Sequence, residues 1–247
     1  MKITYLGHSG FLVVTKEHYL LFDYYIGKLP VFLPEKNLTV FVSHSHKDHY
    51  NKEIFALQNG QIAGDEQWKT KGLFTTYVLS KDINRKQAEE LVKKETGLLF
   101  VRAHETYSLC GDKVTVKTLR STDAGVAFVV EVKEDGKVYR FYHAGDLNLW
   151  KWEGETKAFN NNMEANYRRE MELIKGQHFD AAFVPLDPRL EHFAFGGMDL
   201  FLEMAKAEIV FPMHFWKQPE IIEEYLTARP QVKNLMVLKE EGKTYEF

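Results

Sequence analysis

The segment His44-Ser45-His46-Lys47-Asp48-His49 directly follows the nearly continuous apolar run Leu38–Ser43. Such a run is typical of a strand buried on both faces, and the segment after it is then a loop at the strand's end. His44 and His46 are two residues apart, so on an extended chain their side chains leave the same face and can share one metal ion. Asp48 and the histidine after it diverge, and each can turn towards a second ion once the chain bends into a helix. Imidazole and carboxylate without thiolate suit Zn²⁺, Fe or Mn²⁺ and do not select among them.

Two later strand ends carry side chains of the same kinds. The predicted strand Val138–Tyr142 runs into His143-Ala144-Gly145-Asp146, and Glu208–Pro212 runs into Met213-His214. An isolated aspartate or histidine after a strand is more often a turn former or a satisfied polar residue. Together with the histidine-rich segment, however, the three strand ends offer four imidazole and two carboxylate groups. This set is large enough for a site that holds two metal ions.

The composition is that of an ordinary globular protein, with 45% hydrophobic and 27% charged residues in a chain of 247. The net charge of -3 gives no basic footprint for a long nucleic acid. A single cysteine, Cys110, excludes an intramolecular disulfide and favours a reducing compartment. The start, Lys2–Leu6, reads as a strand rather than a signal peptide, and no apolar run approaches the ~18 residues of a membrane helix. We therefore expect a cytoplasmic protein with no membrane partner.

Strand patterns precede mixed strand and helix patterns in both halves of the chain. Helices are expected at Asn84–Glu95, Met163–Lys175, Met198–Ala205 and Glu220–Ala228, a further helix is expected to begin at Tyr50, and a last strand is expected at Leu235–Leu238. No internal repeat and no linker rich in Pro, Gly or Ser interrupts the chain. The pattern predicts one layered α/β domain over residues 1–247, with sheets inside and helices outside.

These motifs resemble the metallo-β-lactamase superfamily across essentially the whole chain. The resemblance rests on the histidine-rich segment, the Gly-Asp after a strand and the histidine at a later strand's end. The start Tyr5-Leu6-Gly7-His8-Ser9-Gly10-Phe11-Leu12, with His143–Asp146 and Pro212-Met213-His214, is similar to the branch that contains the L-ascorbate-6-phosphate lactonase. The resemblance implies a four-layer αβ/βα sandwich with two divalent metal ions at one edge of the facing sheets.

The resemblance also implies a role for each motif residue. In order along the chain, the implied ligands are His44 and His46 on the first metal, Asp48 and His49 on the second, Asp146 bridging both, and His214 on the second. Asp23, which ends the strand pattern Tyr19–Phe22, resembles an early aspartate of the family that supports the metal loop from behind.

One family ligand is absent from its expected place. The family supplies another histidine to the first metal, from a loop that corresponds here to Arg120-Ser121-Thr122-Asp123-Ala124-Gly125. Asp123 could replace that histidine as a ligand. Asp123 could equally be an ordinary turn residue before Gly125.

Three further features flank the expected site. His8 lies in a glycine-flanked turn and His192 in a loop, so both are candidates to face the substrate, although a structural turn or an exposed loop explains each as well. The aromatic run Trp150–Trp152 could wall an apolar pocket, but core packing explains such residues more often.

A two-metal site of this kind predicts hydrolysis of a small ester, lactone or phosphodiester. Two ions about 3.5–4 Å apart can hold a bridging hydroxide at neutral pH, and Asp48 is the candidate to orient it and take up its proton. Zinc is the first expectation for the metal, with manganese or iron as alternatives. A phosphodiesterase or nuclease of the same superfamily is the first competing hypothesis, and a non-catalytic metal-binding protein with an impaired first site is the second. The pattern leaves the substrate and the oligomeric state open.

Overall fold

The computed structural model of the protein describes residues 1–59 and 74–247. The chain forms two compact units, one of Met1–Arg102 with Glu240–Phe247 and one of Ala103–Lys239. Whether they constitute the single domain predicted over 1–247 stays a prediction. Among the described residues, no helix is both long and apolar enough to cross a membrane.

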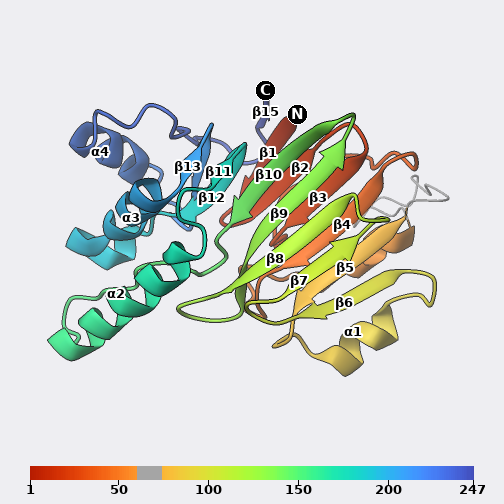
Figure 1. Ribbon diagram of the computed structural model, residues 1–247, viewed down its shortest axis with the longest axis horizontal. Helices are drawn as coiled ribbons and strands as arrows, with labels where there is room; N and C mark the ends of the chain where they lie inside the picture. The colour runs from red at the N-terminus through yellow and green to blue at the C-terminus, as the bar shows by residue number, and fades with distance from the viewer. Residues whose placement is uncertain (60–73) are drawn as a thin grey trace. The chain divides into compact units, whose positions relative to one another are not determined.

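A seven-stranded sheet forms the centre of the first unit, counted over its described residues (Figure 1). Its strands, in spatial order, are β15 (Thr244–Glu246), β1 (Lys2–Gly7), β2 (Gly10–Val14), β3 (His18–Phe22), β4 (Asn37–Val42), β5 (Thr75–Ser80) and β6 (Gly97–Val101). The strands from β15 to β3 pair antiparallel, whereas those from β3 to β6 pair parallel. Because parallel strands end at the same edge, the residues after β3, β4 and β5 emerge side by side.

One face of this sheet is covered by the 3-10 helix η1 (Lys52–Asn59) and by α1 (Arg85–Leu91). Ile54 of η1 and Ala88 of α1 belong to the same buried cluster as alternate residues of β3, β4 and β5. Tyr77 of β5 is fully buried, and its hydroxyl donates a 2.7 Å hydrogen bond to the Ile54 carbonyl. This packing holds the segment after β4 against the sheet.

The described part of the second unit contains a six-stranded sheet and a two-stranded one. The larger sheet runs in the order β14 (Val210–Met213), β12 (Ala181–Pro185), β10 (Lys137–His143), β9 (Val126–Glu134), β8 (Val114–Arg120) and β7 (Thr106–Leu109). The smaller sheet pairs β11 (His178–Phe179) with β13 (Lys206–Ala207). The remaining elements are α2 (Lys157–Glu172), η2 (Pro188–Phe193), α3 (Gly196–Met204) and α4 (Glu220–Ala228).

Parallel pairing sets the functional edge of the second unit. β10 pairs parallel with β12, and β12 with β14, with His143 opposite Phe183 and Pro185 opposite Met213. The segments that follow these three strands therefore leave the sheet at a common edge, as in other open α/β sheets.

The predicted elements are largely present, with several differences. The expected strand Leu235–Leu238 is wrong: Leu235 forms only an isolated bridge with Val210, and the chain closes instead with β15. Strands β5, β7, β11, β13 and β15 and the 3-10 helix η2 were not predicted. Helix α2 begins at Lys157, ahead of the expected Met163, because Thr156 caps it by accepting a hydrogen bond from the Phe159 backbone NH. The helix expected from Tyr50 is the 3-10 helix η1.

Candidate metal centre

The histidine-rich segment leaves β4 at the edge where three parallel strands end. The Ser45 backbone NH donates a 2.8 Å hydrogen bond to Asp82, which follows β5, so the start of the segment is fastened to the neighbouring strand. His44 is fully buried, whereas His46 is exposed, and the two rings bring potential ligand atoms within 4.8 Å of each other. This arrangement agrees with a shared ion for the two residues.

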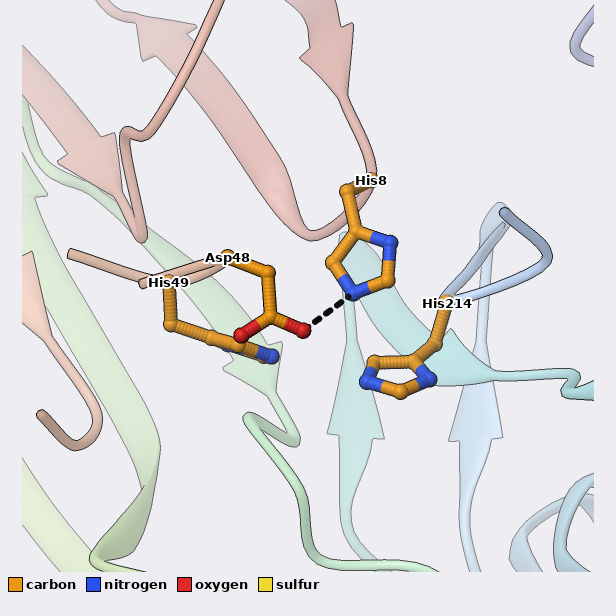
Figure 2. Close-up of side chains that lie close together, drawn as sticks. All are labelled: His8, Asp48, His49 and His214. Atoms are coloured by element: carbon orange, nitrogen blue, oxygen red, sulfur yellow. Dashed lines mark ion pairs between the residues drawn. The ribbon is translucent and has the colours of Figure 1, made fainter. Parts of the chain in front are cut away.

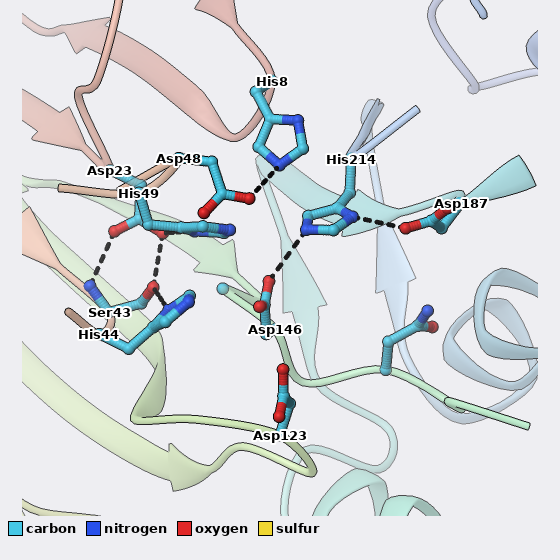
Figure 3. A network of polar contacts seen from close by, with 12 residues as sticks. His8, Asp23, Ser43, His44, Asp48, His49, Asp123, Asp146, Asp187 and His214 are labelled. Carbon is cyan, nitrogen blue, oxygen red and sulfur yellow. Dashed lines mark hydrogen bonds and ion pairs between the residues drawn. The ribbon is translucent and has the colours of Figure 1, made fainter. Parts of the chain in front are cut away.

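Asp23, which follows β3, holds the start of the histidine-rich segment through hydrogen bonds. It is fully buried, accepts hydrogen bonds from the Ser43 backbone NH (2.7 Å) and hydroxyl (2.6 Å), and lies 2.8 Å from Nδ1 of His49 (Figure 3). The Ser43 hydroxyl oxygen also lies 2.9 Å from Nδ1 of His44. Both buried imidazoles are therefore anchored through Nδ1, which makes Nε2 the ligating atom of each ring.

His8, from the turn between β1 and β2, meets Asp48. Nε2 of His8 lies 3.3 Å from Oδ2 of Asp48 (Figure 2). His8, Asp48 and His49 bring potential ligand atoms within 4.8 Å of one another. Burial acts to raise the pKa of Asp48, but the hydrogen bond to His8 and the charge of His49 outweigh it and hold the pKa well below its usual range.

In the second unit, the Gly-Asp after β10 and the histidine after β14 come together. Nε2 of His214 lies 3.4 Å from Oδ1 of Asp146, and both side chains are almost completely buried (Figure 3). Nδ1 of His214 lies 2.7 Å from Oδ2 of Asp187, which is fully buried after β12. His214 thus repeats the arrangement of His49, with a buried carboxylate on Nδ1.

Asp187 was not predicted from the sequence. It is the N-cap of η2, and it binds the Arg189 guanidinium through both carboxylate oxygens, at 2.6–3.1 Å. Burial alone would raise the pKa of Asp187, yet the hydrogen bonds from His214 and Arg189 lower it to about 2. A buried aspartate within the sequence Leu186-Asp187-Pro188 reads as a turn signal, so only the pairing of β12 with β14 reveals its partner.

Asp123 lies on the loop between β8 and β9 and lines a cavity of about 260 Å³ together with Asp146 and His214. Its own side chain is exposed, and its backbone NH donates a hydrogen bond to the Ser121 hydroxyl. His192 does not line this cavity: it is exposed and its Nδ1 contacts the Glu153 carboxylate. The structure thus brings Asp123 beside Asp146 and His214, and leaves His192 outside.

Several candidate residues adopt a backbone conformation that is uncommon outside glycine. The φ angles of His8, Asp23 and His214 are 51°, 42° and 64°. Such conformations persist where surrounding structure over-determines them, and they cluster at functional sites. His8 lies in the glycine-flanked turn that the sequence indicates, whereas no turn pattern in the sequence marks Asp23 or His214.

The donor set fits a divalent transition metal. Each unit supplies a buried histidine whose Nδ1 is held by a fully buried carboxylate, His49 by Asp23 and His214 by Asp187. Ligating histidines almost always have such a partner on the other ring nitrogen, since it fixes the tautomer and raises the basicity of the ligating atom. Imidazole and carboxylate without thiolate suit zinc, manganese or iron.

Comparison with known proteins agrees with this chemistry. The family model described as "Beta-lactamase superfamily domain" matches residues 2–160. A protein of Korarchaeum cryptofilum named "UPF0173 metal-dependent hydrolase" is 27% identical, and the alignment covers 100% of both chains.

Two solved structures show a similar fold. Igni18, described as a novel metallo hydrolase from Ignicoccus hospitalis, has a TM-score of 0.60 at 20% identity, with 100% of this chain and 98% of that one covered. The metallo-β-lactamase fold protein YhfI from Bacillus subtilis has a TM-score of 0.55 at 14% identity, with 99% of each chain covered. These likenesses and the family match confirm the predicted α/β class and metallo-β-lactamase fold.

Proposed function

The chain belongs to the metallo-β-lactamase superfamily, and from this premise we propose that it is a metal-dependent hydrolase that cleaves a small ester, lactone or phosphodiester with a metal-activated water. One observation carries the proposal: His49 and His214 are both held at Nδ1 by fully buried carboxylates. Burying two imidazole–carboxylate pairs is costly unless their polar groups are used, and metal coordination is the use that fits.

The proposed ligands follow the donors of each unit. In the first unit these would be His44, His46, Asp48 and His49, and in the second unit they would be Asp123, Asp146 and His214. Zinc, manganese or iron would supply a bound water of lowered pKa and would polarise the substrate's carbonyl or phosphoryl oxygen. A carboxylate from Asp123 in place of an imidazole favours manganese or iron at the first ion, because carboxylates are harder ligands.

The residues of the chain would prepare the reaction. Asp23 and Asp187 hold the rings of His49 and His214 in one orientation, so that little reorganisation is needed when a ligand binds. The contact of His8 with Asp48 sets the direction of that carboxylate. Asp48 would accept the proton of the attacking water at a carboxylate oxygen.

Metal analysis with matched variants tests this proposal. The purified protein should carry more than about half an equivalent of transition metal, because nitrogen and oxygen sites of this kind retain their ion. His44→Ala and Asp146→Ala should each lower the metal content, Asp123→Ala should lower it for the first ion alone, and Cys110→Ala should leave it unchanged.

Activity is measured on small chromogenic esters, lactones and phosphodiesters, before and after chelation. Turnover should be lost on chelation and regained with added Zn²⁺ or Mn²⁺. A protein that contains no metal and binds none when Zn²⁺ or Mn²⁺ is added would overturn the proposal. A protein that binds metal but hydrolyses no probe would favour a non-catalytic metal-binding role.

A further inference from the structure

We propose that the cavity of the second unit binds an aromatic ring of the substrate against Trp152 and Phe159, with the bond to be cleaved at its Asp146–His214 end. This inference names a substrate class and rests on the proposed function. The residues that line the cavity include Asp146 and His214 at one end and Trp150, Trp152, Phe159 and Met163 along an apolar wall.

The residues that line the cavity differ in how far they are buried. Asp146 and His214 are almost completely buried, Trp152 is half-buried, and Phe159 is 40% exposed. Trp152 and Phe159 therefore contribute the more exposed part of the lining, and Asp146 and His214 the buried part. The polar end is where the chemistry is proposed, so the aromatic end is left for the group attached to the reacting bond.

The apolar wall is built by local sequence. Phe159 and Met163 are four residues apart on α2 and so lie on the same face of that helix. Trp150 and Trp152 are nearly parallel, with ring centroids 6.3 Å apart and an interplanar angle of 11°. An aromatic ring left exposed beside a cavity of this kind is a typical ligand contact.

The tryptophans are fixed in place rather than loosely packed. The Trp150 indole NH donates a 2.8 Å hydrogen bond to the Asp146 carbonyl, which ties the wall to the polar end. Both backbone polar groups of Trp152 hydrogen-bond the Asn160 side chain at 3.0 Å. A rigid wall loses little conformational entropy on binding, and this favours a flat, rigid partner.

Charge argues for an uncharged ring. Arg189 is the only cationic side chain among the lining residues, and its guanidinium is already bound by both oxygens of Asp187. Its charge is therefore largely balanced within the protein. The side chains proposed to contact the ring, Trp152 and Phe159, carry no charge, so they offer no ion-pair partner to a charged ring.

Volume limits the size of the group. The cavity measures about 260 Å³, and a cavity of about 150 Å³ is sufficient for benzene. One ring with a small polar attachment fits.

Calorimetric titration of the protein, with its metal bound, tests the inference through binding alone. The probes are phenylacetate and cyclohexylacetate, which have the same carboxylate and a similar size. Phenylacetate has a flat aromatic ring, whereas cyclohexylacetate has a saturated ring that is not flat. Phenylacetate should bind about fivefold more tightly than cyclohexylacetate. Trp152→Ala and Phe159→Ala should each abolish this preference, and Trp152→Phe, which keeps a ring, should retain most of it.

Phe74→Ala is the matched control, because Phe74 is a similarly exposed ring (50%) outside the cavity lining; the preference should survive that change. Equal affinity for the two probes, or a preference that persists in both alanine variants, would overturn the inference. This result is independent of turnover. A protein that prefers phenylacetate but hydrolyses nothing would contradict the proposed function alone.

Discussion

Asp187 does not line the cavity, yet it holds the ring of His214, a proposed metal ligand. It is fully buried, lies 2.7 Å from Nδ1 of His214 and is neutralised by Arg189. Asp187→Asn keeps the size of the side chain but replaces a carboxylate with a weaker acceptor. We expect metal affinity to fall about tenfold or more, as for other partners of ligating histidines.

Competition with a chelating dye measures that affinity without reference to turnover. Asp180→Asn is the control, because Asp180 is also an aspartate of the second unit that accepts a backbone hydrogen bond, from the Arg140 NH. Unchanged metal affinity in Asp187→Asn would mean that Asp187 serves only to cap η2 and bind Arg189.

The sequence predicted those candidate residues that carry a motif and missed the one that does not. His44 to His49, Asp146 and His214 stand out because they follow apolar runs at a characteristic spacing. Asp187 is separated by 27 residues from His214, and its partnership depends on the parallel pairing of β12 and β14. Whether Asp123 is a ligand stays a prediction, since a loop position beside a cavity suits a turn residue as well.

At the scale of the element, α3 is packed closely against the loop that carries Asp146. A Cβ atom on Gly197, in the first turn of α3, would lie 1.8 Å from the Asn148 side-chain oxygen. Asn148 is almost completely buried, and its backbone is held by the Thr122 hydroxyl, which donates to the Asn148 carbonyl and accepts from the Asn148 NH, so the residue has little room to move.

Gly197→Ala is therefore expected to lower the free energy of unfolding by about 1–3 kcal/mol, as overpacking does. It should also lower metal content, because Asn148 lies two residues beyond Asp146. Urea denaturation and metal analysis measure the two effects.

The neighbouring glycine provides the control. A Cβ on Gly196 would lie 3.0 Å from a terminal methyl of Leu149, which a small rotamer change can relieve. Gly196→Ala should therefore be milder in both measurements. Equal effects of the two substitutions would indicate that loss of glycine itself, and not the contact with Asn148, is responsible.

Prediction of secondary-structure elements from the sequence succeeded where burial gives the strand a clear hydrophobic pattern. β4 reads as a continuous apolar run because its residues are buried on both faces of the sheet. β7 is short, half-exposed and at the edge of its sheet, so its pattern is weak. The apolar segment Leu235–Leu238 is buried at Leu235 and Leu238 but lies beside β14 with only one bridge, which shows that apolar character alone does not create a strand.

At the scale of the whole molecule, the last residues of the chain return to the first unit. β15 pairs antiparallel with β1, with Ile3 opposite Tyr245. The Tyr5 backbone NH donates a hydrogen bond to the Lys243 carbonyl, and the Tyr5 carbonyl accepts one from the Gly242 NH. Without Glu240–Phe247, β1 would become the edge of a sheet while still carrying buried apolar residues. An uncovered edge of this kind both loses hydrogen bonds and promotes association.

Deletion of Glu240–Phe247 should accordingly lower the free energy of unfolding by about 2 kcal/mol or more, from several lost backbone hydrogen bonds. Aggregation should increase, as followed by light scattering during urea or thermal denaturation. Glu246→Ala separates pairing from charge: its ion pair with Lys2 is exposed on both sides, so its loss should change stability little. If the truncated protein keeps its full free energy of unfolding, the pairing of β15 with β1 does not stabilise the sheet. If Glu246→Ala lowers the free energy of unfolding as much as the deletion does, the ion pair with Lys2, and not the strand pairing, holds the C-terminal segment in place.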